Sequence, residues 1–311
     1  MMKKIFILII LFVMFNSTSF GQQDAQYTQY MYNTISVNPA YAGSRDVFSM
    51  TGLYRTQWVG LDGAPKTMTF SGHTPLRNKK LGLGVSLVRD QIWIQDETYL
   101  DIDFSYTINT SEKGQLAFGL KAGAHLLNID FSRTNPENPT DDDFNLSNNV
   151  DNKFSPNVGF GIYYYTDKFY LGYSAPTLLR TKYYDNDVNS ISYLAKDRVN
   201  HYLIAGYVFD LNADLKLKPA VLFKAVQGAP LQADLSGNLL INEKLTLGLA
   251  YRWDAALSGL VGFQLSDGLM IGYAYDWETT ELNNYNSGSH EIILRYELRS
   301  SKDGIISPRF F

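Results

Sequence analysis

The chain is dominated by stretches in which large apolar residues alternate one for one with small or polar residues. In residues 100–108, LDIDFSYTI, every second residue is apolar, and the residues between them are Asp, Ser or Thr. Successive side chains of a β-strand point to opposite faces, so this stretch predicts a strand with one apolar and one polar face. The alternation recurs from residue 46 to residue 298, and no helical period competes with it over a comparable length.

Fourteen such stretches can be counted. They cover residues 46–59, 66–76, 81–90, 99–109, 115–127, 155–166, 169–176, 201–211, 215–226, 230–241, 244–254, 256–266, 268–278 and 289–298. An even number of antiparallel strands is the rule for single-chain bacterial outer-membrane barrels. The sequence therefore predicts an all-β fold, a transmembrane antiparallel β-barrel of about 14 strands.

The connections between these strands fall into two alternating sets. One set is tight and polar, at residues 77–80, 110–114, 166–168, 211–214, 242–244 and 266–268. The other set is longer and more variable, with its longest members after residues 127 and 176. If the first strand runs outward from the periplasm, all the tight turns are periplasmic and all the long loops are extracellular, as in outer-membrane barrels. A soluble sandwich has no reason to sort its loops in this way. A lipocalin-like barrel would keep its bulky apolar groups inside, around a ligand, and has fewer than fourteen strands.

The two faces of the strands predict which solvent each one meets. One face carries bulky apolar groups, with aromatic residues gathered toward a strand end, as in the girdles of membrane barrels. The opposite face is small or polar, as expected of a lumen. We therefore expect Phe104 to face lipid, and Asp103, His73 and His125 to face the lumen.

The N-terminus has the features of an export signal. Lys3 and Lys4 precede an apolar run, and the small residues Ser19 and Gly21 suggest cleavage before Gln22. No later segment is apolar and long enough for a membrane helix, so a membrane location requires a closed barrel. The predicted organisation is a signal peptide (1–21), a pre-barrel segment that is periplasmic or plugs the lumen (22–45), the barrel (46–298) and a periplasmic tail (299–311). The predicted location is the outer membrane of a Gram-negative bacterium.

Composition and motifs give no evidence of an active site. The chain has no Cys, and its four His residues form no metal-binding pair. A G-x-S-x-G motif is absent, so we predict that the protein is not an enzyme and needs no cofactor or metal. The acidic runs 141–144 and 185–189 lack the spacing of a calcium loop, and solvated loop charges are the simpler interpretation. A net charge of −4 without a basic patch gives little reason to expect nucleic acid as a partner.

Two segments are distinctive. QYMYNTISVNPAYAGSRD covers residues 29–46, and YRTQWVGLDGAPKTMTFSGHTPL covers residues 54–76. Together with the late GSHEIILRYEL and the terminal SPRFF, they closely resemble the PorP/SprF family of Bacteroidota over the whole mature chain. The resemblance implies an outer-membrane barrel of the type IX secretion system and, in some members, a role in gliding motility. Some members are core machinery, and others are paired with one large secreted adhesin.

The resemblance supplies the candidate site residues, which are family-motif positions. They are Asn38, Pro39, Tyr41 and Gly43 in the first motif, Arg55, Gln57, Trp58, Gly60, Gly63, Pro65 and Lys66 in the second, and Pro308, Phe310 and Phe311 in the tail. Asn-Pro and Ala-Gly interrupt strand pairing in the first motif, which either plugs the lumen or lies beneath it. The residues 60–65 are interpreted as the turn between strands one and two, and Arg55 and Gln57 have inward parity. Barrel packing and partner binding both remain open as roles.

Two functional hypotheses follow. The first is an outer-membrane component of type IX secretion that docks periplasmic secretion or gliding machinery, or a secreted surface protein. Since both barrel ends are expected on the periplasmic side, the first motif and the tail are the candidate docking face, with self-plugging as the alternative. The second hypothesis is a general diffusion porin, because the many small lumen-facing residues leave room for either a pore or a plug. No small-molecule substrate is evident.

Overall fold

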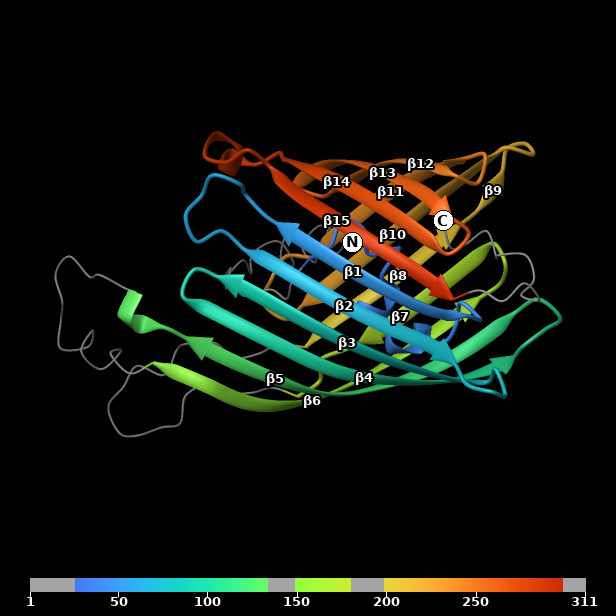
Figure 1. Ribbon diagram of the computed structural model, residues 1–311, viewed down its shortest axis with the longest axis horizontal. Helices are drawn as coiled ribbons and strands as arrows, with labels where there is room; N and C mark the ends of the chain where they lie inside the picture. The colour runs from blue at the N-terminus through green and yellow to red at the C-terminus, as the bar shows by residue number, and fades with distance from the viewer. Residues whose placement is uncertain (1–25, 134–148, 180–198, 299–311) are drawn as a thin grey trace, which may run out of the picture.

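A computed structural model describes residues 26–133, 149–179 and 199–298, which form a closed antiparallel β-barrel (Figure 1). The strands are β1 (Phe48–Thr56), β2 (Lys66–Pro75), β3 (Leu81–Ile92), β4 (Gln95–Asn109), β5 (Gln115–Ile129), β6 (Val150–Tyr165), β7 (Phe169–Ala175), β8 (Asn200–Tyr207), β9 (Phe209–Asp210), β10 (Leu215–Val226), β11 (Gln232–Ile241), β12 (Leu245–Arg252), β13 (Ala256–Ser266), β14 (Leu269–Glu278) and β15 (Ser289–Leu298). The segments β8 and β9 flank Val208 and make one strand of the wall, so the predicted 14-strand barrel is confirmed.

Each strand pairs with its sequence neighbour, and the pairing of β1 with β15 closes the ring. Lipid offers no hydrogen-bond partners, so a sheet in a membrane must have no free edge. Four short 3₁₀ turns complete the described structure: η1 (Thr34–Ser36), η2 (Pro39–Tyr41), η3 (Phe131–Arg133) and η4 (Glu281–Asn284). Within the described ranges, no helix is long and apolar enough to cross a membrane.

The predicted faces of the strands are confirmed. On β4, Ile102 and Phe104 are exposed on the outside of the barrel, whereas Asp103 is completely buried on the inside. His73 and His125 are buried as well, at inward positions of β2 and β5. The outer surface of the wall is therefore apolar and the inner surface is small and polar, as a barrel in lipid requires.

The two ends of the barrel differ in their connections. The end where β1 begins carries the tight turns, and we call it the periplasmic end; the opposite end is the outer end. The outer end carries the segments 57–65 and 279–288 and the connections that contain residues 134–148 and 180–198. Two outer connections, at residues 93–94 and 253–255, are also short, so the outer set is more variable than the sequence suggested.

Some strand limits differ from the predicted ones. The strands β4 and β6 begin at Gln95 and Val150, several residues earlier than the alternation suggested, because backbone pairing continues where the side chains become polar. Strand β1 ends at Thr56, because Trp58 has a positive φ of 45° that breaks the extended conformation.

The lipid-facing assignment can be tested on Phe104. Replacing Phe104 by Arg places a charge on the apolar outer face, which costs about 2–4 kcal/mol at mid-membrane depth. We expect this variant to lose most of the heat-modifiable folded barrel on electrophoresis, whereas Phe104→Leu retains it. Equal folded yields of the two variants would contradict the assignment.

The orientation can be tested by cysteine labelling, since the natural chain has no Cys. Asp62 lies in the β1–β2 connection at the outer end, and Glu112 lies in a tight turn at the periplasmic end; both are exposed. On intact cells, a membrane-impermeant maleimide should label Asp62→Cys and leave Glu112→Cys unlabelled until the outer membrane is opened. The reverse pattern would show that β1 runs inward.

Candidate functional site

The lumen is filled by the part of the chain that precedes β1. We call residues 26–45 the plug; all of residues 27–45 except Ser36 are buried, and the segment lies inside the barrel (Figure 1). The plug contains η1 and η2 but no long regular element. The first family motif is part of it, so Asn38, Pro39, Tyr41 and Gly43 lie within the barrel rather than beneath it.

Small residues of the wall give the plug its space. A Cβ atom added to Gly82 of β3 would lie 2.1 Å from the carbonyl oxygen of Ala42, and one added to Gly119 of β5 would lie 2.1 Å from the backbone nitrogen of Ala40. Asn38 caps η2 by accepting the N–H of Ala40 at 3.0 Å. The inward glycines are thus contact points for the plug backbone, and they do not line an open pore.

Aromatic side chains complete the packing of the lumen. The ring of Tyr41 meets His73 and Tyr163 edge-on, with ring centroids 5.4 and 5.5 Å apart. Tyr30 and Tyr32 of the plug are buried as well and belong to the same hydrophobic cluster. In the described structure, the lumen has the character of a packed protein core.

The plug runs along the length of the barrel. Thr28 donates a hydrogen bond of 2.7 Å from its hydroxyl to Asp276, near the outer end of β14. At the other end of the plug, Arg45 pairs with Glu297, the penultimate residue of β15, and both side chains are buried. Of the two positions expected for the first motif, inside the lumen or beneath it on the periplasmic side, the structure has the first. An even strand number fixes where the barrel strands end, but it leaves the preceding segment free to enter the lumen.

A buried ion cluster anchors the outer end of the plug. Nη2 of Arg55 lies 2.8 Å from Asp276, and Nη1 lies 3.2 Å from Glu291. The carboxylate of Glu291 also accepts the backbone N–H groups of Thr28 and Gln29, at 2.9 and 2.8 Å. We call these five residues the Arg55 cluster. It joins the plug to β1, β14 and β15.

Sequence reasoning identified Arg55 as inward but missed its partners. The sequence did contain evidence of these partners. Asp276 and Glu291 fall on the inward face of their strands, and a buried charge needs a partner of opposite charge. Arg55 and Glu291 are directly opposite each other in the β1–β15 ladder. This pairing follows from barrel closure, which brings the first strand next to the last.

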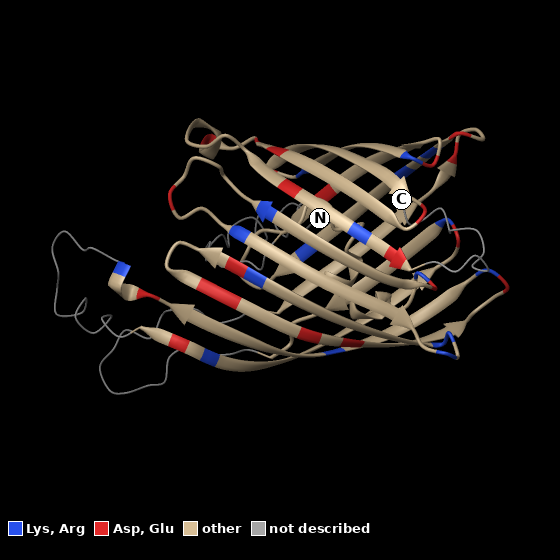
Figure 2. Cartoon of the chain, in the orientation of Figure 1, with Lys and Arg blue, Asp and Glu red and all other residues tan. Residues whose placement is uncertain are grey.

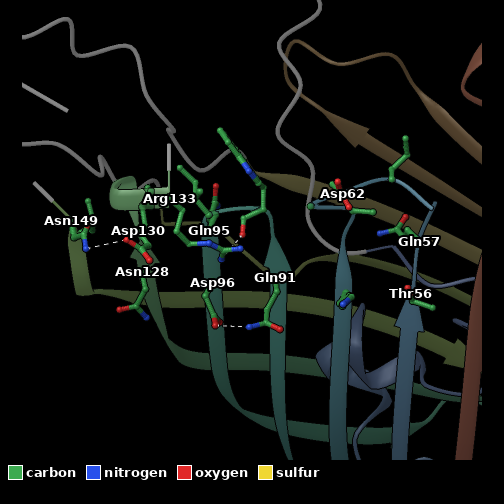
Figure 3. A pocket seen from close by; sticks show the side chains of 18 of the residues that line it. Thr56, Gln57, Asp62, Gln91, Gln95, Asp96, Asn128, Asp130, Arg133 and Asn149 are labelled. Carbon is green, nitrogen blue, oxygen red and sulfur yellow. Dashed lines mark hydrogen bonds between the residues drawn. The ribbon is translucent and has the colours of Figure 1, made fainter. Parts of the chain in front are cut away.

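The second family motif forms part of a cleft at the outer end of the barrel. This outer-rim cleft has a volume of about 990 Å³ and lies between the β1–β2 connection, the β3–β4 turn and the outer ends of β5 and β6 (Figure 3). Of the motif residues, Gln57, Gly60, Gly63 and Lys66 line it. The other lining residues are Tyr54, Thr56, Val59, Leu61, Asp62, Ala64, Gln91, Trp93, Ile94, Gln95, Asp96, Asn128, Ile129, Asp130, Arg133, Asn149, Val150 and Asp151.

Backbone hydrogen bonds hold the β1–β2 connection in place. The N–H of Trp93 donates to the carbonyl of Gly63 at 3.0 Å, and the N–H of Gln57 donates to the carbonyl of Pro65 at 2.9 Å. Gly63 has a φ of +75°, and a Cβ there would lie 2.9 Å from the Trp93 ring. Trp58 does not line the cleft. Its indole N–H donates to Glu278 at 3.1 Å and so ties the β1–β2 connection to the end of β14. The motif therefore specifies a loop of defined shape.

The outer-rim cleft is polar and carries more acidic than basic groups. Asp62, Asp96, Asp130 and Asp151 line it, with only Lys66 and Arg133 as basic residues. Acidic residues gather near the outer ends of β3, β4 and β6 (Figure 2). The hydroxyl of Ser132 holds the pKa of Asp130 below its ordinary value, so this carboxylate stays charged near neutral pH. The pair of Arg89 and Asp96, 2.5 Å apart, offsets one of the acidic charges.

Several sequence predictions lie outside the described residues. They are the signal peptide 1–21, the acidic runs 141–144 and 185–189, and the tail with Pro308, Phe310 and Phe311. Within the described part of the chain, no three His, Asp or Glu residues are grouped so that they could hold a metal ion.

A family model confirms the family resemblance. A family model described as "Type IX secretion system membrane protein PorP/SprF" matches residues 19–296. No match was found among curated proteins. Among solved structures, Omp33 of Acinetobacter baumannii has a TM-score of 0.48 at 10% identity and covers 81% of this chain and 98% of its own. The monoaromatic hydrocarbon channel CymD has a TM-score of 0.48 at 13% identity, and the match covers 89% of this chain and 94% of CymD. A FadL homologue of Pseudomonas aeruginosa has a TM-score of 0.44 at 13% identity, and the match covers 86% of this chain and 92% of the homologue.

The Arg55 cluster can be tested by removing its cation. Arg55→Met leaves two buried carboxylates without their partner, which typically costs about 3–5 kcal/mol. The control is Arg89→Met, which breaks an exposed ion pair of the outer surface that contributes about 0–1 kcal/mol. Denaturant unfolding in detergent micelles should show a large loss of stability for the first variant only. Equal stability of the two variants would contradict an anchoring role.

Proposed function

The chain belongs to the PorP/SprF family of type IX secretion system membrane proteins, and we propose that it acts there as a closed docking barrel in the outer membrane. Its role is to bind a secreted surface protein at the outer face, for export or for attachment. The alternative is a general diffusion porin.

The plugged lumen is the observation that carries this proposal. A diffusion porin needs a water-filled channel through the barrel. Here the plug occupies the lumen along its length, and charged groups fix it at both ends, Arg55 toward the outer end and Arg45 toward the periplasmic end. A barrel that is closed to solutes still provides a rigid membrane platform for another protein.

The two ends of the barrel offer a partner different surfaces. The described periplasmic connections are tight turns, such as residues 242–244 and 267–268, which expose little area. The outer end has the longer connections and the outer-rim cleft, whose lining includes four positions of the second family motif. This asymmetry favours a secreted surface protein over periplasmic machinery as the docked partner.

Conductance in planar bilayers distinguishes docking from diffusion. We expect the full-length protein to show little steady conductance, because the plug excludes water and ions from the lumen. Deleting residues 26–40 should produce a large, steady conductance. Heat modifiability on electrophoresis verifies that the deletion variant still folds as a barrel. A full-length protein that conducts as well as the deletion variant would favour the porin.

The docking role itself needs a test in cells. Pull-down of the barrel from native membranes, followed by mass spectrometry, should recover a secreted surface protein. A strain without the barrel should lose that protein from its surface, and the wild-type gene should restore it. Normal secretion and surface attachment in the deleted strain would refute the docking role.

A further inference from the structure

We propose that the outer-rim cleft binds an extended, Lys- or Arg-bearing segment of the secreted partner. This inference rests on the proposed docking function and assigns it a site and a ligand chemistry. Three properties of the cleft support it: its shape, its hydrogen-bonding groups and its charge.

The cleft has the size and stability of a preformed site. Its volume of about 990 Å³ is at the upper end of the range for ligand pockets. One wall is the β1–β2 connection, which bonds to Trp93 on one side and, from Val59, to the carbonyl of Gly288 at 2.9 Å on the other. A wall tied to both neighbouring connections needs little reordering on binding, so less of the interaction energy is lost.

The lining suits a peptide backbone. Five carboxamides line the cleft, and each has both donors and acceptors, as a peptide group does: Gln57, Gln91, Gln95, Asn128 and Asn149. Four of them use part of this capacity within the wall, as when Gln91 donates to Asp96 at 2.8 Å. A carboxamide has two N–H groups and two acceptor lone pairs, so each retains capacity for a ligand. Figure 3 shows these side chains distributed along the cleft from the β1–β2 connection to Asn149. The exposed ring of Trp93 adds an aromatic surface on which a guanidinium or ammonium group can stack.

The charge of the cleft selects a cationic segment. Asp62 and Asp151 are both exposed, at opposite sides of the cleft, and acids outnumber bases in the lining. Complementary charge increases the association rate and the specificity of a partner.

The test uses full-length protein in lipid nanodiscs. The probe is a short fluorescein-labelled peptide of alternating Lys and Ser, compared with one of alternating Glu and Ser, and binding is followed by fluorescence anisotropy. The charge variant is Asp62→Asn with Asp151→Asn. Its matched control, Asp254→Asn with Asp267→Asn, removes the same charge from exposed turns that do not line the cleft. Ala64→Trp fills the cleft without changing its charge.

We expect the Lys peptide to bind and the Glu peptide not to bind. The charge variant should weaken binding about fivefold to tenfold, because two surface charges are lost, and the matched control should leave it unchanged. Added salt should weaken binding to the wild type, and Ala64→Trp should weaken it without changing the salt dependence. Equal affinity in the charge variant and the matched control would overturn the proposal. Binding of a neutral oligosaccharide in preference to the Lys peptide would also overturn it and would indicate a glycan site.

The same variants separate this inference from the docking function. If the charge variant and Ala64→Trp fold normally and still support surface attachment, whereas the deleted strain does not, the cleft proposal fails and docking stands. If the deleted strain itself attaches the secreted protein normally, the docking function fails. Loss of attachment in both cleft variants, with normal barrel levels, supports the cleft as the docking site.

Discussion

Lipid provides no hydrogen-bond partners, and the rest of this structure follows from that constraint. The backbone of the wall is satisfied only because the sheet closes on itself, with β1 beside β15. Closure gives every strand an outer face in lipid and an inner face sheltered from it. The inner face then needs polar partners of its own, and the plug supplies many of them: Glu291 accepts two plug N–H groups, and Glu297 pairs with Arg45.

The filled lumen relates the two family motifs to each other. The first motif packs against inward glycines of the wall, such as Gly82 and Gly119, and occupies the lumen beside them. The second begins with Arg55, which anchors the plug, and continues into the connection that lines the outer-rim cleft. The second motif thus both anchors the plug inside the barrel and forms part of the cleft at the outer end. Barrel packing and the proposed partner binding are therefore assigned to adjacent parts of the same motif.

The sequence predicts the strands and their faces well, because a period of two is a local property. The alternation around Phe104 and Asp103 separates an apolar face from a polar one, and the strand number and the sorting of the loops then assign lipid to the apolar face. The interior is harder to predict. The plug has no periodic pattern, and its contacts come from residues as distant in sequence as Thr28 and Glu291. The outer-rim cleft is equally non-local, since Asp62, Trp93 and Asp151 are brought together only by the pairing of the successive strands β1 to β6. Polar strand ends, such as Gln95, give no apolar signal that would mark where pairing begins.

The position of the Arg55 cluster has a consequence for assembly. Arg55 belongs to the first strand and Glu291 to the last, and both bind the plug beside the β1–β15 seam. A segment packed along the inside of a cylinder must be inside before the wall is sealed, or else be threaded through it afterwards. The plug contacts both the first and the last strand, so its packing and the closure of the barrel stabilise each other through the buried ion pair at the seam. We therefore expect the filling of the interior and the joining of the first and last strands to be coupled during assembly.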